Sequence, residues 1–311
     1  MNMATTQNDL EKRKKPTEKQ EKPQVKVSKE GVQKKSLGTK AWDVIRYISL
    51  IFASICIILP LLTAFFGSFK TKAEFAESNP LALPESFLNF DNYITAFEKG
   101  QMVLGFANTI IILFFSLVAT ILTGTMTAYI LNRFRFPGRN LINNLFLVAS
   151  LIPSITMQMT VFQIISNLGL FNTRLSTILL YAGTDIISIY IFIQFLENIS
   201  TSLDESAIMD GASYFKIYTH IILPLLKPAI VTVIIIKGVG YYNDFYTPYL
   251  YMPKSELKTI STALFAFKGP FGSQWEVICA GTIITMIPTL IIFLLLQNQI
   301  YEGMTAGSVK E

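Results

Sequence analysis

The sequence predicts an all-α membrane protein with six transmembrane helices and a short cytoplasmic helix between the fourth and the fifth. The chain of 311 residues is 51% hydrophobic and only 15% charged, whereas a soluble domain of this length is about a quarter charged. Six apolar stretches are each long enough to cross a bilayer as a helix, which takes about 20 residues. One polar segment, residues 201–228, interrupts this series between the fourth and fifth stretches.

The beginning of the chain differs from the rest in composition. Residues 1–40 hold 11 Lys or Arg and 5 Asp or Glu, whereas the remainder holds 15 and 16. So polar a segment buries too little apolar surface to offset its loss of conformational entropy, and we expect residues 1–43 to form a disordered basic tail. A signal peptide is not expected, because about forty polar residues precede the first apolar stretch. The folded part lacks the basic face of a nucleic-acid-binding protein.

The membrane domain is expected over residues 44–311. Its spans are predicted at Ile48–Phe69, Val103–Leu131, Leu141–Ile165, Leu175–Leu196, Ile221–Phe245 and Val277–Tyr301. The fourth contains Asp185 and the fifth contains Pro224, Pro228 and Lys237, which makes the fifth the least regular.

The distribution of basic residues predicts the orientation, because cytoplasmic loops are enriched in Lys and Arg. The basic tail, the cluster at residues 133–139, Lys216 and Lys227 all fall on one side of the predicted membrane. Both termini and residues 201–228 are therefore expected in the cytoplasm, and the loop 248–275 outside the cell.

The polar segment begins with the pattern of a helix start. Ser202 is followed three residues later by Glu205, the spacing of a capping box. Gly211 permits the left-handed turn that ends a short helix. Ser213 can cap the next helix, expected over residues 214–222, with Phe215, Tyr218, Ile221 and Ile222 as its apolar side. Pro224 and Pro228 prevent a straight continuation into the fifth span, so a bend is expected there.

A short helix on the cytoplasmic face has two interpretations. It can dock into a groove on another protein, or it can lie on the lipid surface as an amphipathic helix. Its charged residues are Asp204, Glu205 and Asp210. Acidic side chains are not attracted to anionic lipid, which favours a protein partner.

The same segment resembles the EAA loop of ABC importer permeases. The matching residues are Glu205-Ser206-Ala207, Asp210-Gly211-Ala212, Phe215, Ile222-Leu223-Pro224 and Pro228. The triplet departs from the family pattern once, because Ser206 stands where the family has its first alanine, and both residues are small.

Other residues resemble the carbohydrate-uptake branch of that family, the maltose-type inner-membrane permeases. They are Asn108-Thr109, Ala128-Tyr129, Arg133–Arg139, Gly169–Thr173, Asn243–Phe245, Gln274-Trp275 and Gly303–Lys310. The resemblance covers about residues 44–311 and leaves only the tail outside.

This resemblance implies the type I ABC importer permease fold and a multi-pass subunit of the cell membrane. It implies a second six-span permease subunit, an ATPase dimer that binds ATP and Mg, and an extracellular sugar-binding protein that delivers a sugar. The residues expected to couple to the ATPase are Glu205, Ser206, Ala207, Asp210, Gly211, Ala212, Phe215, Leu223 and Pro224. In this interpretation Glu205 caps the helix and offers a charge to the partner, and the small Ala207 lets the helix lie deep in the partner's groove.

The chain has no sequence pattern of an enzyme or a metal site. It contains no glycine at the P-loop spacing before Gly-Lys-Ser/Thr. It has one histidine and two cysteines, and Cys56 and Cys279 each lie in an apolar stretch, where we expect reduced, structural residues. ATP hydrolysis is therefore expected on a separate subunit, with no cofactor on this chain.

Two charged residues are expected inside the membrane. Asp185 lies near the middle of span four and Lys237 near the middle of span five, and these spans run in opposite directions. Charges at this depth are costly and usually functional. The two side chains can form an ion pair; alternatively each faces a wet cavity, or Lys237 extends along its stem to the interface.

The fifth span resembles the broken segments that line transport paths. The expected path residues are Asp185, Lys237, Tyr242, Asn243 and Asp244. Two other classes of function remain open: an ion-driven secondary transporter that uses Asp185 as its ion site, and a membrane scaffold whose cytoplasmic helix recruits a partner. The external loop 248–275 is expected to meet the binding protein, with Gly269, Pro270 and Gly272 at its tip.

Overall fold

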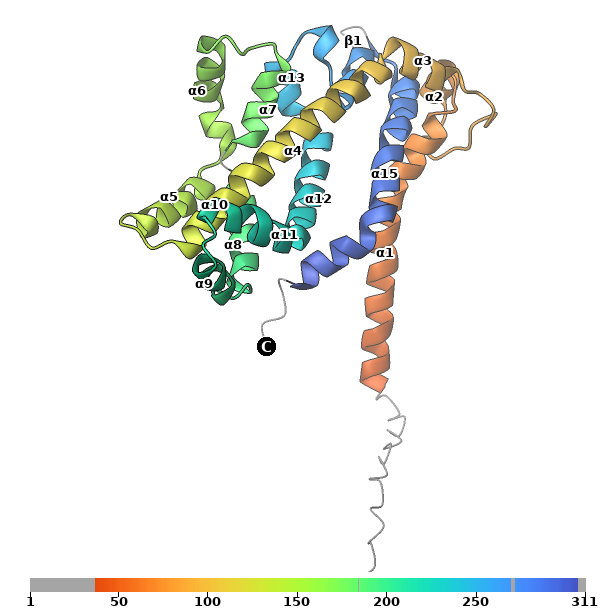
Figure 1. Cartoon of the computed structure of the whole chain (residues 1–311). Coiled ribbons are helices and arrows are strands. Elements are labelled where there is room, and N and C mark those ends of the chain that lie inside the picture. Colours follow the sequence, from red (N-terminus) through yellow and green to blue (C-terminus); the bar gives the residue numbers. More distant parts are fainter. Residues whose placement is uncertain (1–36, 184, 270–271, 307–311) are drawn as a thin grey trace, which may run out of the picture. The chain divides into compact units, whose positions relative to one another are not determined.

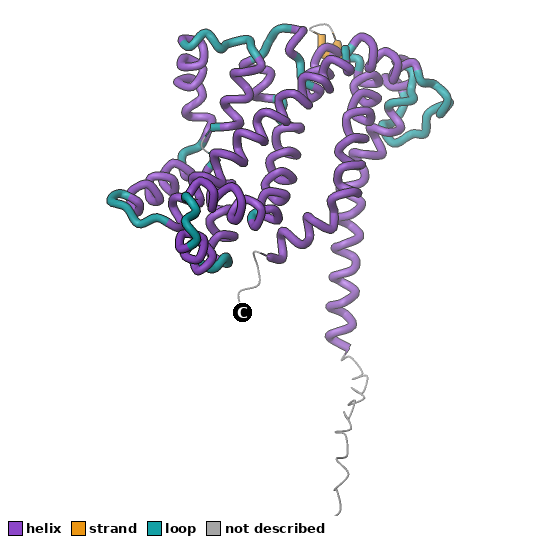
Figure 2. Tube along the Cα trace, viewed as in Figure 1, coloured by secondary structure: helices purple, strands orange, loops and turns teal. Residues whose placement is uncertain are grey.

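A computed structural model describes residues 37–183, 185–269 and 272–306, and within them the chain is mainly helical (Figure 2). The strands found there form one antiparallel pair, with Lys268 opposite Ser273 and Gly269 opposite Gly272. The predicted all-α class is confirmed.

The elements follow one another along the chain with the labels of Figure 1. Their bounds are α1 Leu37–Gly67, α2 Lys72–Glu77, α3 Asp91–Lys99, α4 Met102–Arg133, α5 Arg139–Leu151, α6 Ser154–Asn167, α7 Arg174–Ala182, α8 Ile186–Glu197, α9 Ser202–Met209, α10 Tyr214–Ile217, the π-helix η1 Tyr218–Ile222, α11 Leu223–Leu225, α12 Lys227–Asn243, α13 Tyr246–Tyr251, the 3-10 helix η2 Ser255–Leu257, α14 Ile260–Ala263, the 3-10 helix η3 Leu264–Phe267, β1 Lys268–Gly269, β2 Gly272–Ser273 and α15 Trp275–Ala306.

The chain divides into two units, residues 1–56 and 57–311. The described part of the first unit is the beginning of α1, whose side chains from Trp42 to Cys56 are almost all exposed. Helix α1 begins at Leu37, so residues 37–43, expected in the disordered tail, are helical instead. A helix formed by the following apolar stretch extends backward by one residue per added hydrogen bond until a breaker stops it. Residues 1–36 of the predicted tail lie outside the described residues.

Three single helices in the described chain are long and apolar enough to cross a membrane: Trp42–Gly67 within α1, the whole of α4, and Trp275–Gln297 within α15. Three bent helix pairs also qualify, α5 with α6, α7 with α8, and Tyr214–Leu225 with α12. If each pair is one span, the described residues supply six, the predicted number.

The third predicted span is not one continuous helix. Helices α5 and α6 meet at an angle of 106°. Helix α5 ends before Ile152, whose backbone is extended (φ −78°, ψ 120°), and Pro153 follows. Proline disfavours the helical conformation of the residue before it, which accounts for the break.

The fourth predicted span is also broken, by 41° between α7 and α8. Gly183 ends α7 with a non-helical backbone, and Asp185 stands immediately before α8 as its N-cap residue. Asp185 therefore lies at a helix break rather than within a continuous helix.

The bend predicted at the start of the fifth span is confirmed, with an angle of 69° between Tyr214–Leu225 and α12. Before the bend, Tyr218–Ile222 form the π-helix η1 between α10 and α11, and π-helices are rare and occur mostly as single-turn bulges within α-helices. Pro224 and Pro228 flank the bend at Leu226, and neither has a backbone N–H to continue the hydrogen-bond ladder.

Helix α4 packs against α7, α8, α12 and α14 within residues 57–311. It buries small residues along its length, including Gly105, Ser116, Thr120, Gly124 and Thr125. A side chain at Gly124 would meet the ring of Phe192 at 3.0 Å, so glycine allows α8 to approach closely there.

The buried apolar residues of the described chain include two packed groups. One, which we call the coupling core, consists of Ala128, Tyr129, Leu131, Ile189, Phe192, Leu196, Ala207, Ile217, Tyr218, Ile222, Leu226, Ala229 and Val233. The other joins α3, α4, α14, η3 and α15 through Ala96, Met102, Ile260, Phe267, Val277 and Ala280. The first group holds the polar segment 201–228 to the membrane helices.

Candidate functional site

The short helix predicted in the polar segment is α9, and its start differs from the prediction. Thr201 is the N-cap, with a helical backbone (φ −65°, ψ −21°) and no side-chain hydrogen bond to the helix. Ser202 is already the first helical residue, and its Oγ lies 2.8 Å from Oγ of Ser200. The backbone N–H of Glu205 donates to the carbonyl of Thr201 (3.1 Å), so the predicted capping box is wrong. Glu205 remains an exposed carboxylate in the first turn, where negative charge is favourable.

The end of α9 agrees with the prediction. Gly211 has φ +78°, the left-handed conformation expected of it. The N–H of Gly211 donates to Ile208 and that of Ala212 to Ala207, both at 2.9 Å, which satisfies carbonyls at the helix end. Ser213 then accepts a hydrogen bond from the N–H of Lys216 at 3.4 Å and caps α10, as predicted.

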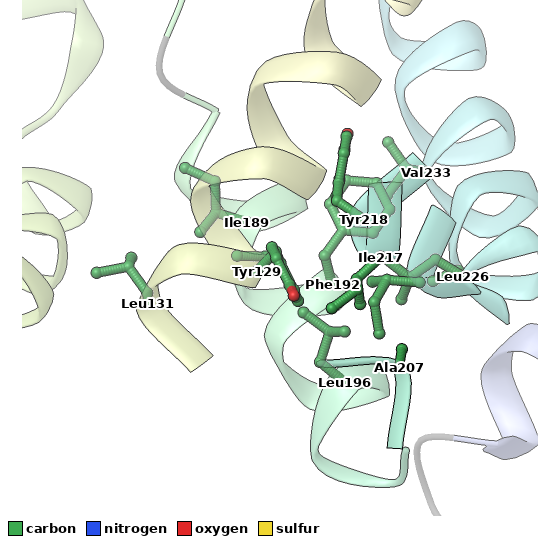
Figure 3. Close-up of a cluster of buried hydrophobic side chains, with 13 residues drawn as sticks. Tyr129, Leu131, Ile189, Phe192, Leu196, Ala207, Ile217, Tyr218, Leu226 and Val233 are labelled. Atoms are coloured by element: carbon green, nitrogen blue, oxygen red, sulfur yellow. The ribbon is translucent and has the colours of Figure 1, made fainter. Parts of the chain in front are cut away.

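Ala207 faces the interior of this chain. It is buried in the coupling core with residues of α4, α8, α10 and η1 (Figure 3). The expectation that its small size lets α9 enter a partner's groove is therefore wrong. A larger side chain at this position would instead clash with the coupling-core residues of this chain on which α9 packs.

The other predicted coupling residues divide by exposure. The exposed ones are Glu205, Ser206, Asp210, Gly211, Phe215 and Pro224. Ala212 and Leu223 are half-buried against the coupling core.

Large apolar side chains are exposed around α9 and α10. Met209 is 87% exposed and Phe215 70%, and Tyr214 is also exposed. Phe215 was expected on the apolar side of this helix, together with Tyr218, Ile221 and Ile222. Tyr218 and Ile222 are buried and Ile221 packs against the coupling core, whereas Phe215 is exposed, because the π-helical turn that begins at Tyr218 changes the direction of successive side chains.

A buried charge pair fastens α9 to the end of α4. Nε of Arg133 lies 3.2 Å from Oδ2 of Asp204. The hydroxyl of Tyr129 donates to Oδ1 of Asp204 (3.0 Å), and Nη2 of Arg133 donates to the carbonyl of Ile199 (2.7 Å). Asp204 is 8% exposed. A carboxylate so enclosed requires a cation and hydrogen bonds, and α4 supplies both.

A second link joins α4 to the π-helix η1. The hydroxyls of Thr125 and Tyr218 are 2.8 Å apart and buried. The rings of Tyr129 and Tyr218 lie with centroids 5.8 Å apart, and Phe134 packs between Tyr129 and Tyr214. Figure 3 shows Tyr129 and Tyr218 on facing elements. The polar segment is therefore attached to α4 as well as to α8 and α12.

Asp185 and Lys237 form the ion pair considered from the sequence. Nζ of Lys237 lies 2.8 Å from Oδ2 of Asp185, and both side chains are largely buried. The hydroxyl of Ser188 donates to the same carboxylate at 2.6 Å. The pair connects the break before α8 to the middle of α12.

Near the far end of α12, Asp244 joins three elements. Its Oδ2 accepts a hydrogen bond from the hydroxyl of Tyr181 on α7 (2.9 Å). Its Oδ1 accepts from the N–H groups of Tyr246 and Thr247 at the start of α13. The rings of Tyr181 and Tyr241 are stacked, with centroids 4.2 Å apart.

The other two predicted path residues lie apart from this group. The hydroxyl of Tyr242 donates to the carbonyl of Thr285 on α15 (2.8 Å). The side-chain amide of Asn243 is exposed and donates to the carbonyl of Val239 on its own helix (3.0 Å). The five predicted path residues thus make four separate sets of contacts: the Asp185–Lys237 pair, and one set each for Asp244, Tyr242 and Asn243.

The loop 248–275 is held against α4 by the pair Asn108-Thr109. The Asn108 amide donates to the carbonyls of Glu256 (2.9 Å) and Lys258 (2.8 Å) and accepts from Nε of Arg174 (2.8 Å). The hydroxyl of Thr109 accepts from the N–H of Ile260 (2.9 Å). Of the expected loop tip, Gly269 and Gly272 form the strand pair, and Pro270 lies outside the described residues.

Comparison with known proteins identifies the family. The model of the family "binding-protein-dependent transport system inner membrane component" matches residues 120–305. The chain belongs to this family of transport permeases, and the predicted resemblance to ABC importer permeases is confirmed.

Relatives in this family carry sugar-transport names. The probable starch degradation products transport system permease protein AmyC of Thermoanaerobacterium thermosulfurigenes is 34% identical, over 84% of this chain and 94% of its own length. The galactooligosaccharides transport system permease protein GanQ of Bacillus subtilis is 31% identical, over 85% and 94%. A bacterial ABC transporter involved in the import of the acidic polysaccharide alginate contains a chain of the same fold, with a TM-score of 0.75, 20% identity, and coverage of 85% and 98%.

The sequence interpretation did not find the contact among Tyr129, Arg133 and Asp204. A signal was present, because Tyr129 and Arg133 are four residues apart and so share one face of a helix. Asp204 adjoins the matched triplet but is not part of it. Among the described residues, no group of His, Cys, Asp and Glu could hold a metal ion.

Proposed function

We propose that this chain is a transmembrane subunit of an ATP-driven importer that moves a sugar or oligosaccharide across the cell membrane. A binding protein outside the cell delivers the sugar, a second six-span permease completes the path, and a separate ATPase dimer binds ATP and Mg. The names of the relatives AmyC and GanQ support a carbohydrate substrate. Their chains align with this one over more than four-fifths of its length.

The single observation that carries the coupling proposal is the construction of α9. The helix is fixed on its inner side by Ala207 and the buried Asp204–Arg133 pair. On its outer side it presents Met209 and exposed carboxylates. A rigidly held short helix that exposes an apolar side chain among charged ones is suited to bind in a groove on a protein partner. Its acidic residues disfavour binding to anionic lipid. Glu205 and Asp210 are the proposed charge contacts.

Movement of α9 would be transmitted to several membrane helices at once through its packing contacts. Asp204 is tied to α4, and the coupling core continues into α8 and α12. Farther along, the Asp185–Lys237 pair joins α8 and α12 again. We propose that ATPase motion tilts α4, α8 and α12 as a group, and that Asp185, Lys237, Tyr242, Asn243 and Asp244 lie beside the sugar path.

The orientation proposed from the basic residues places both termini and α9 in the cytoplasm and the loop 248–275 outside. In that orientation the loop held by Asn108 and Thr109 faces the binding protein. An ion-driven carrier with Asp185 as its ion site has less support, because Asp185 is already neutralised by Lys237.

The test is purification of the tagged full-length chain from its native membrane, followed by identification of the co-eluting proteins. The proposal predicts an ATPase and a second six-span permease, and uptake of a labelled oligosaccharide by vesicles only with ATP inside and the binding protein outside. Uptake driven by an ion gradient without ATP would contradict it.

A further inference from the structure

A cavity of about 440 Å³ lies in the turn between α4 and α5. Its lining residues are Arg135, Phe136, Gly138, Arg139, Asn140 and Leu141. Phe136 also packs against the coupling core, and none of the six belongs to the predicted ATPase-coupling residues. The turn directly follows Arg133 at the end of the long apolar helix α4, and clustered basic residues are typical of the cytoplasmic end of a span.

Two arginines at this cavity, Arg135 and Arg139, have no carboxylate partner among the residues that the structure describes. In the described residues, the ion pairs within 4.0 Å include one for Arg133 and none for Arg135 or Arg139. Nε of Arg139 is buried and donates to no acceptor there. A buried guanidinium N–H without an acceptor is costly, and arginine forms its strongest hydrogen bonds with anions.

The backbone adds positive potential at the same place. Gly138 has φ +90° and is the N-cap of α5, a helix of 13 residues without a side-chain cap. The first N–H groups of a helix have no partner within it, and Asn140 and Leu141, in this first turn, line the cavity. The guanidinium groups and the N-terminus of α5 therefore both favour a negatively charged ligand.

The outer face of α5 is apolar and uncovered. Leu141, Leu145 and Val148, spaced four and three residues apart, lie on one face and are all exposed. Ile142 and Phe146 on the other face pack against the coupling core. A cationic cavity thus adjoins an apolar strip that leads away from it along the helix.

We propose that the cavity binds the headgroup phosphate of an anionic phospholipid whose acyl chains lie along Leu141, Leu145 and Val148. The guanidinium groups of Arg135 and Arg139 contact the phosphate oxygens, for which their planar donor sets are well suited. A free phosphate would leave the apolar strip uncovered, and an apolar protein surface would leave the two cations unpaired. The proposed orientation makes this the cytoplasmic leaflet, but binding itself does not depend on the orientation.

The test measures phospholipid bound to the full-length chain, purified with its partner subunits, by native mass spectrometry with added dioleoylphosphatidylglycerol. One tightly bound lipid per copy of this chain is expected. Arg135→Gln and Arg139→Gln should each weaken its binding about fivefold, and the double variant about twenty-five-fold, as expected for basic residues at a membrane surface. Because Arg135 is exposed, its variant tests the site without disturbing the fold.

Lys216→Gln is the matched control, since it removes one exposed positive charge on the same side and should leave binding unchanged. Dioleoylphosphatidylcholine should bind more weakly than phosphatidylglycerol, and millimolar glycerol 3-phosphate should not displace the lipid. The proposal is overturned if both arginine variants bind phosphatidylglycerol like wild type, or if glycerol 3-phosphate competes. It is also overturned if the assembled transporter binds no lipid because another subunit covers α5.

Discussion

Asp185–Lys237 and Asp204–Arg133 place four charged side chains inside the described molecule, each next to an opposite charge. Removing a charge from water is costly, and the attraction between partners offsets that cost only while both are present. Each pair also joins elements distant in sequence, α8 with α12 and α9 with α4. Single and double substitutions therefore have different expected effects.

Asp185→Asn should destabilise the protein by about 3 kcal/mol, because it leaves the Lys237 ammonium buried without its partner. The double variant Asp185→Asn/Lys237→Met should be more stable than Asp185→Asn alone, since no unpaired charge remains. Thermal unfolding in detergent measures both effects. The single variant Lys237→Met completes the comparison, and if the loss in the double variant equals the sum of the two single losses, Asp185 and Lys237 are not energetically coupled.

Asp204→Asn should weaken the attachment of α9 to α4, with a loss of about 3 kcal/mol, because Arg133 loses its buried counter-charge. The matched control is Asp210→Asn, which changes an exposed carboxylate at the end of the same helix and should alter stability by less than about 0.5 kcal/mol. Unfolding temperatures of the two variants, compared with wild type, provide the measurement. Equal decreases in unfolding temperature for Asp204→Asn and Asp210→Asn would show that the buried Asp204–Arg133 contact does not contribute to stability.

At the scale of elements, the turn after α9 depends on one backbone conformation. Gly211 has φ +78°, and a β-carbon built there would meet no atom within 4 Å. Gly211→Val should therefore cost about 1–2 kcal/mol through backbone strain alone. Gly211→Asn should be tolerated better, because asparagine enters the left-handed region more readily. We expect the valine variant to insert normally but to show reduced sugar uptake per ATP hydrolysed, and wild-type coupling in it would contradict the proposed role of this turn.

The elements were predictable where one local signal dominates. Long uncharged stretches indicated α1, α4 and α15, and Gly211 and Pro224 indicated the end of α9 and the bend before α12. The break at Pro153 was missed because apolar residues continue through it, and composition alone cannot distinguish one straight helix from two joined at 106°. The start of α9 was displaced by one residue because Thr201 and Ser202 are both plausible caps.

The contacts of the candidate site were less predictable than its elements. The Asp185–Lys237 pair could be anticipated because isolated charges in apolar spans need partners. The inward position of Ala207 and its neighbour Asp204 depends on how α9 rotates on the coupling core, which tertiary packing decides. Tyr242 and Asn243 lie next to Asp244 in sequence, but helical geometry directs their side chains to different neighbours.

At the scale of the whole molecule, the proposed orientation predicts which residues are reachable from each side. In a cysteine-free background, Asp210→Cys should react with a membrane-impermeant thiol reagent only from the cytoplasmic side. Lys254→Cys, also exposed, should react only from the outside. Labelling of position 210 in intact cells would reverse the orientation and remove the basis for an ATPase contact at α9.

The central claim, that an ATPase binds the outer side of the α9–α10 segment, is tested most directly by changing its exposed apolar residues. Met209→Asp and Phe215→Asp alter side chains that are exposed in this chain, so the fold should persist. Leu83→Asp is the control, since Leu83 is also exposed but lies in the segment between α2 and α3. We predict about thirtyfold weaker ATPase binding for the first two, as loss of a contact worth about 2 kcal/mol implies, with sugar uptake lost and the control unchanged. Retention of the ATPase and of uptake by both Met209→Asp and Phe215→Asp would contradict the account.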